Sequence, residues 1–154
     1  MSTPIVPAGG ASHGSSFAVA VRPEVPAVGP VCDAADAHAV ARGVGAYERN
    51  ELRIVLKELL TNVAKHASAR GDVGVRVEAV HDAIRIRIDD DGVAFNPTTA
   101  HGPRITSLVE TATVGGMGLQ LVRSAVRAFR YRREASRNVV EAEIALLEPL
   151  GKGG

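Results

Sequence analysis

Two patterns of hydrophobic and polar residues dominate the chain. In NELRIVLKELLTNVAKHASA, residues 50–69, leucines and valines recur every three or four positions, which predicts an amphipathic helix with Asn50 as its N-cap. In VGVRVEAV and AIRIRIDD, residues 73–80 and 83–90, hydrophobic and polar residues alternate strictly. That alternation predicts two half-buried strands joined by the short turn HD.

Weaker signals complete the order of elements. FAVAVRPEVPAV begins as a short strand that Pro23 ends, and VCDAADAHAVARGV predicts a first helix between Asp33 and Gly43. A later helix is expected from Gly118 to about Phe129, followed by a hairpin of FRYRR and NVVEAEIAL around EASR. Two or three helices on one face of a mixed, mostly antiparallel sheet, an α+β two-layer sandwich, fit this order.

Length and composition favour a single domain. The chain has 154 residues, of which 45% are hydrophobic, and this suits one globular unit. Residues 1–16 are rich in Ser, Gly and Pro and are expected to form a disordered tail, residues 17–148 the domain, and residues 149–154 a flexible end. Two tyrosines, three phenylalanines and no tryptophan leave Val, Leu, Ile and Ala to build the core.

Charge and cysteine content exclude several classes of protein. A net charge of +1 gives no reason to expect a nucleic-acid or membrane partner, and Cys32 alone cannot form an internal disulfide or a cysteine metal cluster. No hydrophobic run approaches the roughly 20 residues of a spanning helix, and the N-terminus lacks the features of a secretory signal. A cytoplasmic protein is expected. The six arginines from Arg123 to Arg137 favour a solvated face or a surface for a protein partner.

Three polar residues share one edge of the strong helix. Glu58, Asn62 and His66 are spaced by four, so each lies about 40° round the helix from the one before. Relative to the hydrophobic face, Glu58 falls just outside, Asn62 at the border and His66 within it. A carboxylate and an amide at the edge of the hydrophobic face are well placed to line a cleft. There the carboxylate could orient a nucleophile and the amide oxygen could hold Mg²⁺. An ordinary polar helix edge is the alternative.

A triple aspartate follows the second alternating strand. Continuing the alternation of Ile84, Ile86 and Ile88 points Asp90 inward, with its two neighbours outward. An inward carboxylate needs a partner, and an exocyclic amine such as that of adenine would serve. Gly92 lets the backbone approach a flat ligand. The alternative is an acidic turn that closes a hairpin.

Glycines in VGGMGLQLVRSAV precede an amphipathic helix. The run lacks the Lys-Ser/Thr of a P-loop, and Leu121 stands where a Rossmann motif needs its third glycine. Gly115, Gly116 and Gly118 can still offer free backbone N–H groups to an anion at a helix N-terminus. The stretch from Asn96 to Gly116 lacks sustained periodicity, and so long a loop suggests a functional role.

Together these motifs resemble the GHKL superfamily of ATP-binding domains, whose fold is the Bergerat α/β sandwich. ELLTNVAKHA resembles its N-box, DDGVAFNP its first glycine box and GGMGLQLV its second. Within the superfamily, these segments and YRREASRNVV are similar to the bacterial anti-sigma-factor serine/threonine-protein kinases of partner-switching modules. The resemblance covers about residues 45–147.

The resemblance implies a role for each matching residue. Glu58 would be the general base, Asn62 would ligate Mg²⁺ and Asp90 would accept the adenine amine of ATP or ADP. The nucleotide contacts implied by the resemblance also include Lys65, Gly92, Gly115, Gly116, Gly118 and Leu119. The segment 96–116 would be the ATP lid, and His66 is expected to be structural.

Three positions depart from the pattern of the superfamily. Ala94 replaces a glycine of the first glycine box, and Asn138 stands where many relatives have a threonine near the adenine. Val114 stands where some relatives have a lid arginine, and Arg104 is not assigned that role. None of the three removes the implied base or metal ligand.

The resemblance also implies partners. The expected reaction transfers phosphate from ATP to a serine of a STAS-domain anti-sigma-factor antagonist, while the unmodified antagonist displaces a sigma factor from the kinase, which is commonly a homodimer. Two alternatives remain at this point. One is a nucleotide-binding module that sequesters a partner without phosphorylating it, and the other is a histidine-kinase-like domain that acts on a separate phosphotransfer protein.

Overall fold

A single five-stranded sheet forms one layer of the molecule. The computed structural model describes residues 16–99 and 116–151. The strand order is β1-β2-β3-β5-β4, and every pairing among the described strands is antiparallel, so the sheet is not mixed there. The strands are β1 (Ser16–Val21), β2 (Val73–Val80), β3 (Ala83–Asp90), β4 (Ala128–Glu134) and β5 (Arg137–Ala145). Of the predicted N-terminal tail, only Ser16, which opens β1, lies within the described residues.

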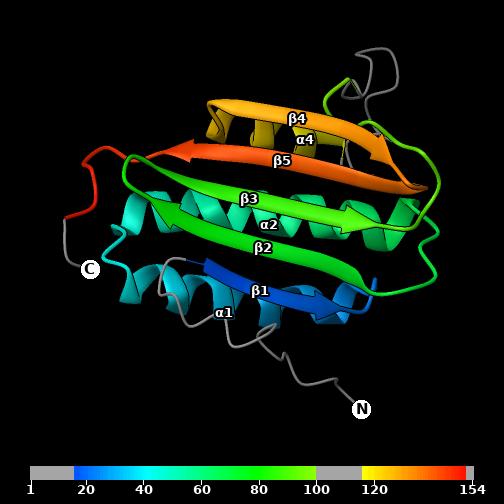
Figure 1. Ribbon diagram of the computed structural model, residues 1–154, viewed down its shortest axis with the longest axis horizontal. Helices are drawn as coiled ribbons and strands as arrows, with labels where there is room; N and C mark the ends of the chain where they lie inside the picture. The colour runs from blue at the N-terminus through cyan, green and yellow to red at the C-terminus, as the bar shows by residue number, and fades with distance from the viewer. Residues whose placement is uncertain (1–15, 100–115, 152–154) are drawn as a thin grey trace.

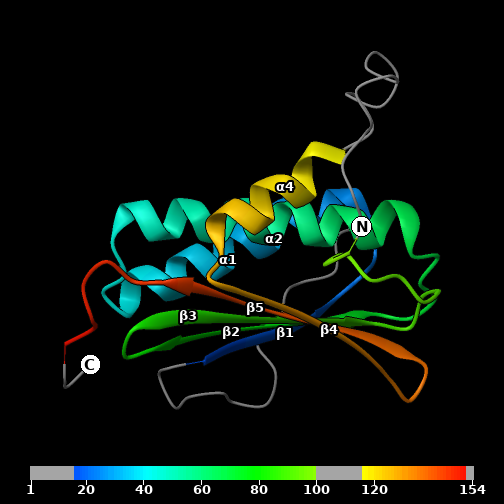
Figure 2. The ribbon, with the colours of Figure 1, turned by 90° about the horizontal axis from the view of Figure 1, so that it is seen from above.

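Helices form the second layer. They are α1 (Val28–Ala41), which follows a 3₁₀ turn at Val25–Ala27, α2 (Ala46–His66) and α4 (Gly116–Ala125). Figure 1 looks at the open face of the sheet with the helices behind it, and Figure 2 shows all three helices on the same side. The predicted α+β sandwich is confirmed, with α2 behind the middle of the sheet.

The core lies between the two layers and consists almost wholly of aliphatic side chains. The isoleucines of β3 face α2, as the alternation predicts, and Phe17 is the one aromatic residue among the described residues that is buried to this degree. The side chains with the least exposure are Leu52, Leu56, Ile84, Ile86, Ile88, Ile144, Val31, Val55, Val73, Val77 and Val122. The bounds of β2 and β3 are those predicted, since the turn between them is tight.

The strong helix begins earlier than predicted. Its N-cap is Gly45, not Asn50, which lies inside the helix. Contacts distant in sequence explain the extra turn: Glu48 is buried and accepts a hydrogen bond from the backbone N–H of Leu147 at 2.7 Å. Arg49 donates to Asp36 at 3.0 Å. Helix propensity depends on residues that are close in sequence, so it could not predict these distant contacts.

The helix predicted up to Phe129 ends at Ala125, because the chain joins the sheet. Arg127 N–H donates to the Glu143 carbonyl at 2.8 Å, and Phe129 pairs with Ala142 in the ladder between β4 and β5. The hairpin around EASR is confirmed. At the other end of β5, Leu150 N–H donates to the His81 carbonyl at 2.8 Å, so the chain still contacts the sheet there.

The β4–β5 turn places two ordinary residues in the left-handed region. Ala135 has φ 49° and Ser136 has φ 65°, where glycine and asparagine are favoured. We expect Ser136→Gly to stabilise the protein by roughly 0.5–1 kcal/mol, measured by urea unfolding. The matched control Ser124→Gly lies inside α4 and should destabilise. A lower midpoint for Ser136→Gly would contradict this description of the turn.

None of the helices in the described part of the chain is long and hydrophobic enough to cross a membrane.

Candidate active site

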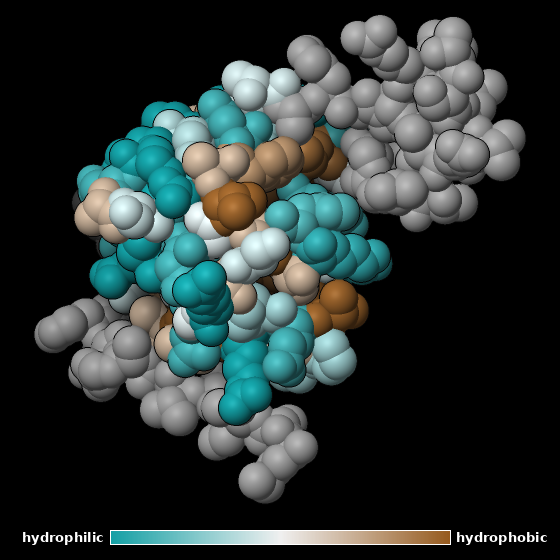
Figure 3. Space-filling view, turned by 90° about the vertical axis from the view of Figure 1, so that its right-hand side faces the viewer, coloured by the Kyte–Doolittle hydropathy of each residue, from teal (hydrophilic) through white to brown (hydrophobic). Residues whose placement is uncertain are grey.

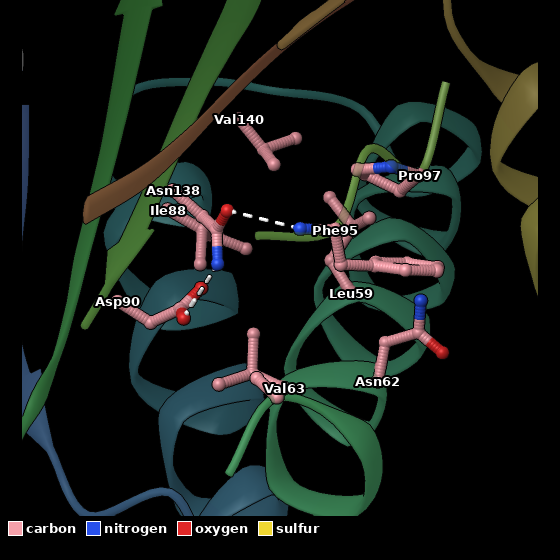
Figure 4. Close-up of a pocket in the computed structure, with 10 residues that line it drawn as sticks. Leu59, Asn62, Val63, Ile88, Asp90, Phe95, Pro97, Asn138 and Val140 are labelled. Carbon is pink, nitrogen blue, oxygen red and sulfur yellow. Dashed lines mark hydrogen bonds between the residues drawn. The ribbon is translucent and has the colours of Figure 1, made fainter. Parts of the chain in front are cut away.

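A hollow opens between the C-terminal half of α2 and the end of β3. These ends of the two elements lie at the right-hand side of Figure 1. The free space between its lining residues is about 360 Å³, a value that includes open solvent. Its lining consists of Leu59, Asn62, Val63, Ala67, Ile88, Asp90, Phe95, Pro97, Asn138 and Val140. Figure 4 shows α2 and the sheet as its two walls, with the polar groups of Asp90 and Asn138 between them. Figure 3 shows this end of the molecule as largely hydrophilic with small hydrophobic areas.

Asp90 points inward, as predicted, and is only 3% exposed. Its Oδ1 accepts hydrogen bonds from Gly92 N–H at 2.8 Å and from the Asn138 side-chain amide at 3.0 Å. Its Oδ2 accepts none from the described residues, although the side chain lines the hollow. A buried carboxylate with one satisfied and one unsatisfied oxygen is suited to receive a donor from a ligand.

Gly92 is explained by contact within the protein. A Cβ at this position would lie 2.7 Å from the Cβ of Ala67 and closer still to the Ala67 carbonyl oxygen. The next residue, Val93, donates its N–H to that carbonyl at 2.7 Å. The close approach that requires glycine is thus to the end of α2. A contact between Gly92 and a ligand stays a prediction.

Substitution of this glycine should therefore destabilise the fold. We expect Gly92→Ala to lower the free energy of unfolding by about 2 kcal/mol, because the new methyl group overlaps backbone that cannot move freely. In the control Gly29→Ala, the methyl group would meet nothing within 4 Å. Urea unfolding of both variants is the measurement, and equal midpoints would contradict the packing described here.

The N-terminus of α4 lies against α2. Gly116, Gly118 and Leu119 belong to its first turn, whose N–H groups have no partner within the helix. A Cβ on Gly118 would clash with the Glu58 side chain, with 2.8 Å to its carboxyl carbon. The Leu119 side chain is buried in the core, so only its backbone is available to a ligand. The structure thus brings Glu58 and the glycine-led helix together.

Glu58 lies one helical turn before Asn62 on α2. Its side chain is half-buried and forms no hydrogen bond or ion pair with the described residues. Four residues of helix correspond to a rise of about 6 Å. The carboxylate is therefore next to the hollow and beside the first turn of α4.

Asn62 lines the hollow with an unsatisfied amide. Its Nδ2 is buried and forms no hydrogen bond in the described structure. Because none of the described residues bonds this nitrogen, the amide is not fixed by them, and either of its ends can face a ligand. Mg²⁺ is commonly held by one or two protein oxygens together with substrate phosphates, and one amide oxygen fits that role. Among the described residues, His, Cys, Asp and Glu form no group of three or more that could hold a metal ion.

The exposure of one N-box residue, His66, differs from the helical-wheel prediction. His66 is exposed rather than on the buried face, and Lys65 is exposed as well. The prediction for His66 was wrong because α2 ends there, whereas its last fully buried core residue is Leu60 and Val63 is only partly covered. Contact of Lys65 with phosphate stays a prediction.

Most of the predicted lid lies outside the described residues, including Gly115, Arg104 and Val114. Its first residues are described: Asn96 Oδ1 accepts from Thr98 N–H at 2.9 Å, which forms a local turn. Arg123 of α4 donates to the Pro97 carbonyl at 3.2 Å. The start of this segment is therefore fixed to α4 at the rim of the hollow.

Asp91, beside the inward Asp90, fixes the chain that follows α2. Its carboxylate accepts from Arg70 N–H at 2.8 Å and Gly71 N–H at 3.0 Å. These backbone donors, that of Arg70 first, hold the pKa of Asp91 below its ordinary value. Because the folded pKa is lower than the unfolded one, this contribution is complete above about pH 4 and is lost as the pH falls through the folded pKa.

This shift predicts a specific acid dependence. We expect the stability of the wild type to fall as the pH is lowered below about 4, and Asp91→Asn to show a shallower fall over that range. Urea midpoints measured from neutral to acidic pH would show the difference. Asp72→Asn, which changes an exposed carboxyl without a hydrogen bond in the described structure, serves as the control. Equal slopes for wild type and Asp91→Asn would contradict the assignment.

Several residues of this site were not singled out as contributors from the sequence. Phe95 and Pro97 line the hollow, and Tyr131 and Arg133 contact Asn138. Arg133 is one of the arginines expected to form a solvated face or a partner surface, yet its Nη1 also donates to the Gly92 carbonyl at 2.9 Å. The alternation of residues in β4 places Arg133 on the same face as Phe129 and Tyr131. This pattern could have indicated that Arg133 faces the site.

Three features of the structure define the GHKL class of ATP-binding domains. They are helices on one face of an antiparallel sheet, an inward Asp at a strand end, and a helix that begins with glycines beside a Glu and an Asn. Comparison with protein families agrees: residues 20–144 match the histidine kinase-like ATPase domain. The match covers most of the chain, which therefore belongs to this family.

Two curated bacterial proteins are similar to the chain at modest identity. One is the serine/threonine-protein kinase BtrW of Bordetella bronchiseptica, 30% identical over 88 residues, which cover 55% of this chain and 62% of the relative. The other is the serine-protein kinase RsbW of Listeria innocua, 32% identical over 85 residues, which cover 50% of this chain and 54% of the relative. The chain thus spans somewhat more than half the length of the curated relatives it matches.

Proposed function

We propose that this protein is an ATP-dependent protein kinase that phosphorylates a serine of a partner protein. The observation that carries the proposal is the position of Glu58, whose carboxylate lies against Gly118 in the first turn of α4 and one turn from Asn62. In this arrangement the free N–H groups of α4 bind the ATP phosphates. The carboxylate, which is not engaged by any described residue, would accept the proton of the serine hydroxyl while the hydroxyl oxygen bonds to the γ-phosphorus and ADP leaves.

The remaining residues bind and orient the nucleotide. The Asp90 Oδ2 would accept a hydrogen bond from the adenine amine, and the side chains of Phe95 and Val140, which line the hollow, would contact the base. The Asn62 oxygen and the phosphates hold Mg²⁺, whose charge offsets the charge of the phosphates. Gly92, Gly115, Gly116, Leu119 and Lys65 complete the proposed contacts.

The partners are inferred from the sequence motifs that resemble those of the partner-switching kinases, and the named relatives are protein kinases. We propose that the substrate is a STAS-domain antagonist, and that the protein is an anti-sigma factor that binds its sigma factor as a homodimer in the cytoplasm. Phosphate at the contact between antagonist and kinase adds charge that is costly to desolvate, so the modified antagonist dissociates. The free kinase then binds the sigma factor, and no direct contact with nucleic acid is involved.

The test is incubation of the protein with γ-labelled ATP, Mg²⁺ and a purified STAS-domain antagonist encoded near it. The proposal predicts an acid-stable phosphate that mass spectrometry places on a serine of the antagonist. Acid-labile phosphohistidine would show a histidine-kinase-like activity instead. Nucleotide binding without any phosphorylation of the antagonist would leave a pure sequestration module.

A further inference from the structure

On the helix-covered face of the sheet, three paired residues from β3, β5 and β4 form a row across the strands. The two end residues of this row carry opposite charges. In the β3–β5 ladder Asn138 pairs with Asp90, and in the β4–β5 ladder it pairs with Arg133. Asn138 therefore lies between a carboxylate and a guanidinium, and it is only 3% exposed. A neutral amide in this place can contact both neighbours, because one end of it donates and the other accepts.

The hydrogen bonds of Asn138 allow only one orientation of its amide. Its Oδ1 accepts from Tyr131 Oη at 2.7 Å, from Arg133 Nη1 at 3.1 Å and from Phe95 N–H at 3.2 Å. Its Nδ2 donates to Asp90 Oδ1 at 3.0 Å and to the Val93 carbonyl at 2.8 Å. Guanidinium and backbone N–H groups only donate, whereas carboxylate and carbonyl oxygens only accept, so a reversed amide would lose four of these five contacts.

This orientation determines which atom of Asp90 faces a ligand. Asn138 Nδ2 and Gly92 N–H both bind Oδ1, and they leave Oδ2 as the free acceptor of a carboxylate that lines the hollow. The same amide also fixes the wall opposite α2. It contacts Val93 and Phe95 of the segment after β3, and Arg133 binds the Gly92 carbonyl of that segment. Figure 4 shows Asn138 between Asp90 and Phe95, with both hydrogen bonds drawn.

We propose that Asn138, oriented by Tyr131 and Arg133, is a positioning residue that makes the site selective for purines with a 6-amino group. The inference rests on the nucleotide site of the proposed function. A fixed carboxylate oxygen accepts the 6-amino group of adenine but faces the carbonyl oxygen of a 6-oxopurine, where two acceptors repel. A site built to hydrogen-bond one ligand group discriminates strongly against an analogue that lacks it.

The experiment compares ADP with inosine diphosphate, which has an oxygen in place of the 6-amino group. Binding of each to the full chain with Mg²⁺ is measured by calorimetry for the wild type, Asn138→Asp and Tyr131→Phe. In Asn138→Asp an acceptor replaces the donor that faces Asp90 Oδ1 and the Val93 carbonyl. Tyr131→Phe removes only one donor to the amide. Arg132→Lys is the matched control, because Arg132 pairs with Glu134 and Glu141 on the open face of the sheet.

The wild type is expected to prefer ADP by at least about tenfold. Asn138→Asp should lower the affinity for ADP by about tenfold or more and that for inosine diphosphate far less, so that the preference collapses. Tyr131→Phe should reduce the preference by a few-fold, and Arg132→Lys should leave it unchanged. If these residues only supported the fold, their substitution would lower the apparent affinity for ADP and for inosine diphosphate equally, because the loss of folded protein does not depend on the base.

Two results would overturn the inference while leaving the nucleotide site in place. One is an unchanged preference in both Tyr131→Phe and Asn138→Asp, or in Tyr131→Phe alone if the aspartate variant does not fold. The other is a wild type that binds ADP and inosine diphosphate equally. A wild type that binds neither nucleotide would overturn the proposed function itself, and the two failures are therefore distinguishable.

Discussion

Glu58→Gln should slow phosphoryl transfer to the antagonist serine by at least about 100-fold, because an amide cannot accept the hydroxyl proton. The substitution keeps the shape of the side chain against Gly118. The affinity for ADP should therefore stay within about twofold of that of the wild type, as expected when only an interaction of the transition state is removed. Single-turnover transfer of labelled phosphate, with ADP calorimetry on the same protein, measures both quantities.

The same helix offers a matched control for this variant. Glu51 lies seven residues earlier on nearly the same side of α2 and forms no hydrogen bond with the described residues. Glu51→Gln should transfer phosphate at the wild-type rate. If Glu58→Gln retained full activity, Glu58 would not be the base, and the observation that carries the proposed function would need another explanation.

Asp90→Asn should weaken ADP binding by roughly 10- to 100-fold without unfolding the protein, because a hydrogen bond to a charged group is worth about 1.5–3 kcal/mol. Two donors, Gly92 N–H and Asn138 Nδ2, converge on Oδ1. The oxygen of the new amide would keep those two bonds, and its NH₂ group would take the place of the free Oδ2. A donor would then face the donor of the adenine.

The control for this variant is the adjacent carboxylate. Asp89 lies on the open face and pairs with Arg137 at 2.7 Å, away from the hollow. Asp89→Asn should bind ADP as the wild type does. Thermal unfolding of both variants separates a loss of affinity from a loss of fold. Wild-type affinity in a folded Asp90→Asn would show that Asp90 does not contact the base.

The predictions from sequence succeeded where a residue's environment follows from its neighbours along the chain. The alternation of Ile84, Ile86 and Ile88 places Asp90 inward, and the structure confirms it. The hydrophobic stripe of α2 likewise predicted its buried face. Each pattern shows which face of a single helix or strand packs against a neighbouring layer, and periodicity carries this information.

The failures lie where contacts join distant parts of the chain. The start of α2 depends on the contact of Glu48 with Leu147. The hydrogen bonds of Asn138 with Asp90 and Arg133 depend on β5 lying between β3 and β4. The alternation of residues within one strand does not show which strands are its neighbours in the sheet. His66 shows a related limit, since a helical wheel assumes that the layer beneath a helix extends as far as the helix does.

Binding of ATP with Mg²⁺ in the hollow beside α2 can be measured by calorimetric titration of ATP into the wild-type chain with and without Mg²⁺. One ATP should bind per chain, and more tightly when Mg²⁺ is present, because the Asn62 oxygen would hold the ion and the charge of the ion would offset that of the phosphates. If ATP bound under neither condition, the hollow would not be a nucleotide site.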